Sequence, residues 1–170
     1  MDQLEESLTD DTILVSIMFV NNEVGTVEPI YDIENIVSNS NALLHVDAVQ
    51  AISHLDIKFS EFKIDTMSIT AHKFGGPKGV GILLVKNNTP IEYSQLGGEQ
   101  ETKRRAGTES VPQIVGMTKA LEIPTKNRDQ NNIHLMQLKE LFLVSLQERA
   151  IPFEVNGSMV ETTGHILNLY

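Results

Sequence analysis

The chain has 170 residues, of which 41% are hydrophobic and 21% charged, and this size and composition predict one domain with a substantial buried core. Its 23 Asp and Glu outnumber 13 Lys and Arg, for a net charge of −10, and no basic stripe extends beyond the short run Lys103–Arg105, so a nucleic-acid partner is not expected. The sequence holds no signal-peptide pattern and no apolar run of membrane-spanning length, which predicts a cytoplasmic protein without membrane contact.

The first apolar run, residues 12–20 (TILVSIMFV), is rich in β-branched residues and is typical of a central strand buried on both faces of a parallel sheet. It ends in NNEVGTVEPI, where Asn, Gly and Pro interrupt the pattern. Open α/β sheets bind their ligands at this end of the strands, which would place Asn22 at a site. The alternative is that Asn22 is a turn residue whose side chain bonds its own backbone.

A strand–helix–strand order follows, with a helix expected over residues 31–38 and a second strand over residues 42–46 (ALLHV). Asp47 comes directly after that strand, and Gln50 would share its face if a helix starts there. Asp47 would then serve either as the N-cap of the helix or as a carboxylate that keeps a cofactor's ring nitrogen protonated.

The stretch SITAHKFGGPKGVG joins two expected strands, residues 67–70 and 79–85, through a glycine-rich turn. Lys73 sits in this turn beside a hydroxyl (Thr70), an imidazole (His72) and many unobstructed N–H groups that could hold a phosphate. A lysine amine whose pKa is lowered by burial or by a neighbouring cation forms a Schiff base with a cofactor aldehyde. The alternative is a glycine-rich hairpin with a solvated lysine. The histidines show no metal-ligand spacing, and no metal site is expected.

The remaining elements are a polar loop and packing elements. Residues 91–108 form a loop that reaches a ligand or a neighbouring subunit, or else lies solvated on the surface. Helices are expected over residues 109–121 and 131–150, and short strands over residues 153–155 and 165–169.

Four motifs in this order, NNEVGTVEPI, HVDAVQ, SITAHKFGGPKGVG and GGEQETKRRAGTESVPQIVG, closely resemble those of the cysteine desulfurases. These belong to the class V branch of the fold-type I pyridoxal-phosphate enzymes. The resemblance implies an α/β fold comprising part of the large cofactor-binding domain, a mostly parallel sheet with flanking helices. Residues 1–125 would form this part, and residues 126–170 a connecting helix and the start of a small C-terminal domain.

The resemblance also implies residue roles around pyridoxal 5'-phosphate. Lys73 would form the Schiff base with the cofactor and later transfer a proton. Asp47 would pair with the pyridinium nitrogen, Gln50 would bond the phenolic oxygen, and Asn22 would lie near that oxygen.

Three further residues would bind the phosphate. Thr70, which stands where the family usually has Ser, and His72 would do so within the chain. Thr108, in the R-x-G-T motif, would reach the phosphate of the other subunit of a homodimer.

The implied reaction converts L-cysteine to L-alanine and an enzyme persulfide, whose sulfur passes to an acceptor scaffold protein for iron–sulfur cluster assembly. The family polypeptide is far longer and carries a nucleophilic cysteine, whereas these residues include none. The chain is therefore expected to be a fragment of such an enzyme. The alternative is a non-catalytic remnant or interaction module that keeps the fold. Another class V enzyme, such as an aminotransferase or a selenocysteine-specific lyase, is disfavoured by the GGEQ…RRAGT loop.

Overall fold

The computed structural model describes residues 1–170 and is built around a four-stranded open sheet in the order β1-β2-β3-β4. The first three strands are parallel, and the last is antiparallel to its neighbour. This confirms the expected α/β class with a mostly parallel sheet. The strands are β1 (Leu14–Met18), β2 (Leu43–Asp47), β3 (Thr66–Thr70) and β4 (Gly81–Val85).

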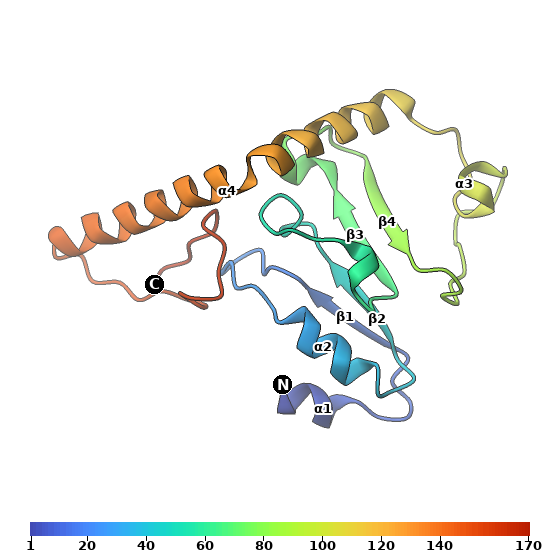
Figure 1. The fold of residues 1–170 in the computed structure, drawn as a ribbon, viewed down its shortest axis with the longest axis horizontal. Coiled ribbons are helices and arrows are strands. Elements are labelled where there is room, and N and C mark those ends of the chain that lie inside the picture. The colour runs from blue at the N-terminus through green and yellow to red at the C-terminus, as the bar shows by residue number, and fades with distance from the viewer.

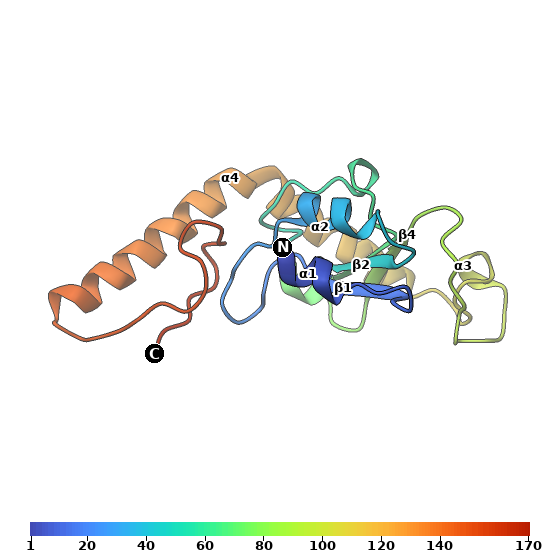
Figure 2. The same cartoon turned by 90° about the horizontal axis from the view of Figure 1, so that it is seen from below.

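One helix lies against the sheet, and a much longer one runs across its end (Figure 1). The longer helix, α4, crosses the carboxyl ends of the parallel strands and continues beyond the sheet, and the C-terminal segment 149–170 folds back beside it (Figures 1 and 2). The helices are α1 (Asp2–Ser7), α2 (Ile30–Val37), α3 (Gln100–Lys103) and α4 (Val111–Glu148), with 3-10 turns η1 (Phe59–Glu61) and η2 (Ala71–Phe74).

The two faces of the sheet differ because side chains alternate along each strand. One face of β2 and β3 is fully buried and packs with α2, whose residues Ile30, Ile33 and Val37 are also buried. The opposite face is polar and half-buried, which makes it the face that can receive a ligand. Its residues on these strands are Leu43, which is apolar, and the polar residues His45, Asp47, Thr66, Ser68 and Thr70.

The first strand differs from its sequence expectation. Strand β1 lies at the edge of the sheet rather than at its centre, because only β2 pairs with it. Ile13 and Leu14 are consequently 81% and 51% exposed, although the apolar run predicted burial on both faces.

A single helix replaces the two expected over residues 109–121 and 131–150. Helix α4 continues through Pro124, a residue that predicts a break because it lacks an N–H and crowds the preceding turn. Polar contacts hold the middle of α4 to the turn after β2: Arg128 pairs with Asp56 at 2.6 Å, and Asn132 donates to the His54 carbonyl at 2.7 Å.

The two short C-terminal strands are reduced to one antiparallel bridge between Val155 and Leu169. Glu154 and Tyr170 exchange backbone hydrogen bonds of 3.0 and 3.1 Å beside it, so the pairing is local. No helix in the chain is both long and apolar enough to cross a membrane.

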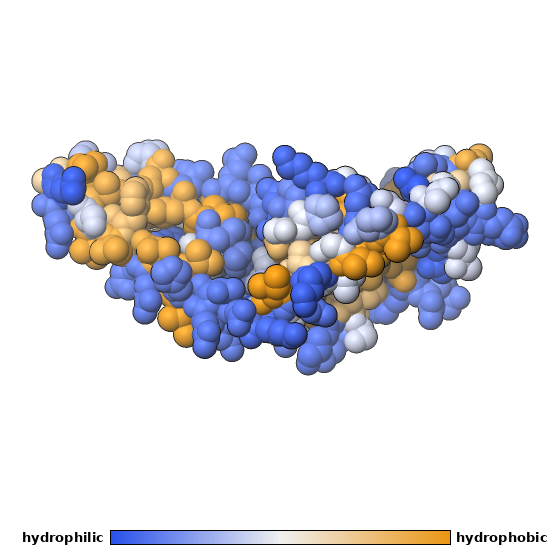
Figure 3. Space-filling model, turned by 90° about the horizontal axis from the view of Figure 1, so that it is seen from above, coloured by the Kyte–Doolittle hydropathy of each residue, from blue (hydrophilic) through white to orange (hydrophobic).

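Apolar side chains gather on the surface of the long helix (Figure 3). They lie on its second half and on the neighbouring loop, where few other elements cover them. The exposed residues of this apolar surface include Ile133, Met136, Leu141, Phe142, Val144, Met159 and Val160.

Candidate functional site

The polar face of the sheet brings two expected residues to its carboxyl edge. Asp47 is the last residue of β2 and is in register with Ser68 of β3, and Thr70 is the last residue of β3. Since residues two apart in a strand share a face, Ser68 and Thr70 point to the same side as Asp47.

Asp47 also makes the turn contact that a capping residue would make. Its Oδ1 accepts a 2.8 Å hydrogen bond from the Val49 N–H. The chain after Asp47 forms turns rather than the helix considered for it, so Gln50 lies on a turn. Oδ2 of Asp47 makes no hydrogen bond within the chain, which leaves one oxygen of a half-buried carboxylate for a ligand.

Lys73 lies in η2, directly after β3, and its side chain is exposed. The structure thus exposes this lysine, whereas burial was one of the two environments considered from the sequence. The neighbouring His72 is exposed too, and its Nδ1 lies 3.0 Å from Thr70 Oγ1. The expected lysine, imidazole and hydroxyl thus come together at one strand end.

Two glycines fix the shape of this turn. Gly75 ends η2 in the left-handed region with φ of 82°, which a residue without a Cβ adopts freely. At Gly76 an added Cβ would lie 2.9 Å from the Ala71 Cβ and 3.2 Å from the Ala120 Cβ of α4. The absence of a side chain at Gly76 therefore lets η2 pack closely on α4.

Asn21 and Asn22, which follow β1, have different surroundings. Oδ1 of Asn21 accepts from the Glu23 and Val24 N–H groups at 2.9 and 3.1 Å, so Asn21 makes the turn contact that was the alternative for Asn22. Asn22 is exposed and its side chain makes no hydrogen bond within the chain, so its amide is open to a ligand.

Gln50 contacts a pair of stacked imidazoles. Its Oε1 lies 3.4 Å from Nε2 of His165, and the His165 ring stacks on His54 with centroids 3.8 Å apart and planes 7° from parallel. Burial lowers the pKa of His54, and the hydrogen bond that its ring donates to Asn132 Oδ1 acts in the opposite direction and raises it. Burial, with the charges of His54, Lys139 and Lys73, lowers the pKa of His165 to about 4. Both rings are therefore neutral at pH 7.

Thr108 is the expected site residue that the chain does not bring to the others. It is exposed in the segment between α3 and α4, and no hydrogen bond joins it to Thr70 or His72. Figure 1 shows α3 on a loop that projects from the β4 side of the molecule.

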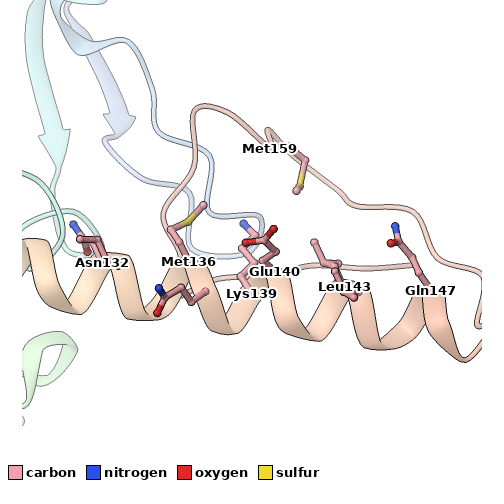
Figure 4. A pocket seen from close by; sticks show the side chains of 10 residues that line it. Asn132, Met136, Lys139, Glu140, Leu143, Gln147 and Met159 are labelled. Atoms are coloured by element: carbon pink, nitrogen blue, oxygen red, sulfur yellow. The ribbon is translucent and has the colours of Figure 1, made fainter.

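A groove of about 620 Å³ lies elsewhere, along the second half of α4 (Figure 4). Met136 and Leu143 line it from the helix, and Met159 faces them from the C-terminal segment. None of the expected site residues lines this groove, so it is not the candidate site.

The residues at the carboxyl edge form a donor set that fits pyridoxal phosphate. Lys73 offers an accessible amine for the aldehyde, and Thr70 and His72 offer a hydroxyl and an imidazole for the phosphate. Asp47 offers a free carboxylate oxygen for a protonated ring nitrogen.

Comparison with known proteins identifies the family of this chain. The model of the family described as Aminotransferase class-V matches residues 1–168, and the chain belongs to this family. It is 43% identical over 157 residues to cysteine desulfurase IscS of Clostridium botulinum (strain Hall), covering 92% of this chain and 40% of that protein. It is 45% identical over 145 residues to cysteine desulfurase IscS of Methanosarcina thermophila, covering 85% of this chain and 36% of that protein.

Solved structures agree with the fold. A NifS-like protein superposes with a TM-score of 0.93 at 36% identity, covering 99% of this chain and 46% of the other. A structure of SspA in complex with cysteine gives a TM-score of 0.80 at 33% identity, covering 99% and 46%. The chain thus spans less than half the length of the relatives it matches.

Sequence reasoning missed His165 and His54 as neighbours of the site. The two are 111 positions apart in the chain and come together only because the C-terminal segment returns past α4. The only signal for His165 in the sequence is its place in a segment expected to be a strand, and His54 lies in no expected element, so neither residue indicates a partner.

Proposed function

We propose that this chain is the part of a cysteine desulfurase that binds pyridoxal phosphate. The observation that carries the proposal is the exposed Lys73 amine at the carboxyl edge of the sheet, beside the Thr70–His72 pair. The relatives named cysteine desulfurase support it, and no finding favours the alternative of a non-catalytic interaction module.

When bound, the cofactor supplies an electron sink for negative charge that develops on the substrate carbon. Lys73 would hold the cofactor covalently and would move a proton at that carbon. Asp47 holds the proton on the ring nitrogen through Oδ2, while Oδ1 keeps the turn in place.

The other site residues orient the cofactor. Gln50 and Asn22 would bond the phenolic oxygen, and Thr70 and His72 would bind the phosphate. Thr108 would complete the phosphate site of a second copy in a homodimer, which its exposure and its lack of a hydrogen bond to Thr70 or His72 of the same chain support.

The complete enzyme would act in the cytoplasm on L-cysteine and pass its sulfur to an acceptor scaffold protein for iron–sulfur cluster assembly. In the same proposal, residues 1–125 belong to the large domain and residues 126–170 to the connecting helix and the start of the small domain. That boundary falls inside α4, next to Pro124.

The proposal is tested by titrating the purified chain with pyridoxal phosphate and recording its visible absorbance band. We expect a saturable band for the wild type, absent in Lys73→Ala, because Lys73 lies in η2 directly after His72, at the end of the strand that carries Thr70. Lys78→Ala is the matched control, since Lys78 is an exposed lysine of the same loop. Loss of the band in Lys78→Ala, or its persistence in Lys73→Ala, would refute the assignment of Lys73.

A further inference from the structure

The side chain of Gln50 has one polar contact within the chain, the Nε2 atom of His165. The two residues come from the turn after β2 and from the C-terminal segment, 115 positions apart. The distance of 3.4 Å is long for a hydrogen bond, as is common in sites that tighten when a ligand binds. Which atom donates decides how the Gln50 amide is oriented.

The surroundings of His165 determine which of its nitrogens carries the proton. Nδ1 is buried and has no hydrogen-bond partner. A neutral imidazole has one N–H and one lone pair, and a buried N–H without an acceptor is costly. The proton therefore belongs on Nε2, which faces the Gln50 amide.

The His54 ring, which stacks on His165, is held by contacts of its own. Asn132 of α4 donates its Nδ2–H to the His54 carbonyl at 2.7 Å, so its Oδ1 is left to accept from His54 Nδ1–H at 3.1 Å. His54 is thereby held in one tautomer and orientation, and its ring supports His165 across the 3.8 Å stack.

We infer that His165 is a positioning residue for Gln50: its Nε2–H donates to Oε1 and turns the NH₂ group of the amide toward the cofactor site. An amide with the opposite orientation would place two donors against each other. The NH₂ group is the end of Gln50 that can donate to a phenolic oxygen. This inference rests on the proposed role of Gln50 in the cofactor site.

The neighbourhood of the two residues is the site itself. Gln50 lies on the turn that follows Asp47, so its contact with His165 is next to the carboxyl edge of the sheet. The charge of Lys73 also helps to lower the pKa of His165. Lys139 of α4 acts on the same ring, with its Nζ 3.1 Å from Thr162 Oγ1.

The first test uses the chain without cofactor. Nitrogen-15 NMR of the imidazoles distinguishes the two tautomers, and we expect His165 protonated at Nε2 and His54 at Nδ1. Protonation of His165 at Nδ1 would overturn the inference whether or not the chain binds pyridoxal phosphate.

The second test is a double-mutant cycle read by pyridoxal phosphate affinity. We expect His165→Phe to weaken binding about three- to tenfold in the wild type, the range of one neutral hydrogen bond, and by less than about twofold in a Gln50→Ala background. Independent effects of the two changes would refute the inference.

Two further variants separate positioning from folding. His54→Phe also removes one imidazole from the stack but leaves the Gln50 contact, and we expect it to weaken binding less than His165→Phe does. His165→Asn keeps an N–H donor and should restore part of the affinity. Equal losses in His54→Phe and His165→Phe would mean that the stack, and not the donor, matters.

The outcomes of the two proposals differ. If the wild-type chain binds no pyridoxal phosphate, the proposed function fails. The inferred contact between His165 and Gln50 is then tested by the NMR measurement of the His165 tautomer alone. If Gln50→Ala binds as well as the wild type, the role of Gln50 fails, and the inferred contact is again judged by NMR.

Discussion

At the scale of single residues, Asp47 shows that a structural and a chemical role need not compete. A carboxylate has two oxygens, and here Oδ1 accepts from the Val49 N–H while Oδ2 makes no bond within the chain. Asparagine retains the first function, because its carbonyl oxygen can accept the same bond, but it cannot hold a negative charge against a protonated ring nitrogen.

We therefore expect two substitutions of Asp47 to differ. Asp47→Asn should leave the free energy of unfolding near that of the wild type and weaken pyridoxal phosphate binding, since a hydrogen bond to a charged group is worth about 1.5–3 kcal/mol. Asp47→Ala should weaken binding similarly and also lose about 1 kcal/mol of stability, as for a lost cap. Urea denaturation beside cofactor titration measures both, and normal binding by Asp47→Asn would leave only the capping role.

His165 predicts how stability depends on pH. Its pKa falls from an ordinary 6.5 to about 4 in the folded chain, so the unfolded chain binds more protons between these values. The free energy of unfolding is therefore highest above pH 6.5, falls as the pH drops from 6.5 towards 4, and has lost the whole contribution of His165 once the pH is below 4. The groups that face the ring and oppose its protonation are His54, Lys139 and Lys73.

The measurement compares the wild type with His165→Phe, which keeps an aromatic ring and cannot titrate. From pH 7 to pH 5 the wild type should lose about 1 kcal/mol relative to the variant, a value reduced for solvent access to the half-buried ring. A stability difference between the two proteins that stays constant with pH would mean that His165 has an ordinary pKa.

At the scale of elements, patterns local in the sequence predicted the sheet, and long-range contacts determined the rest. The runs before Asp47, before Lys73 and after Gly79 became β2, β3 and β4 because apolar, β-branched residues specify strands wherever they pair. Pro124 predicted a helix end. Helix α4 continues past this proline, and Arg128 and Asn132, which follow it, bind Asp56 and His54 on a turn that is distant in the sequence.

In the candidate site, too, local sequence predicted one part, and contacts between distant segments determined the other. The Lys73 turn is a contiguous motif, and its residues come together as expected from their spacing. The neighbours of Gln50 could not be predicted, because His165 reaches it only where the C-terminal segment folds back beside α4. The position of β1 at the edge of the sheet could not be predicted either, because the sequence of one strand does not determine which strands pair with it.

The packing of η2 on α4 gives a prediction for Gly76. Gly76→Ala would place a Cβ 2.9 Å from the Ala71 Cβ and 3.2 Å from the Ala120 Cβ, so η2 and α4 must separate. We expect a stability loss of about 1–3 kcal/mol from this overpacking, together with weaker cofactor binding as Lys73 moves.

Gly75→Ala is the control, because its Cβ meets nothing within 4 Å and only the φ of 82° is unfavourable. It should cost about 1–2 kcal/mol, the cost of a left-handed residue, and leave the contact with α4 intact. Cofactor binding that falls equally in both variants would show that the turn conformation, rather than its packing on α4, positions Lys73.

At the scale of the whole molecule, the chain combines an acidic surface with a site for an anion. The net charge of −10 opposes a phosphate, so binding must come from the local groups: His72, Lys73, the Thr70 hydroxyl and the open backbone of the glycine-rich turn. The expected reaction also needs a thiolate, and none of the 170 residues is cysteine.

We therefore predict that the 170-residue chain, even saturated with pyridoxal phosphate, forms no protein persulfide from L-cysteine. Transfer requires a thiolate to attack the substrate sulfur, and Ser, Thr and Met side chains do not form a persulfide, while Lys73 is occupied by the cofactor. Intact-protein mass spectrometry after incubation with cysteine and the cofactor should show no reductant-sensitive gain of one sulfur atom. Slow release of alanine or pyruvate would be compatible with the prediction, whereas a stoichiometric gain of sulfur removed by a thiol reductant would demonstrate a transfer route that uses no cysteine of this chain.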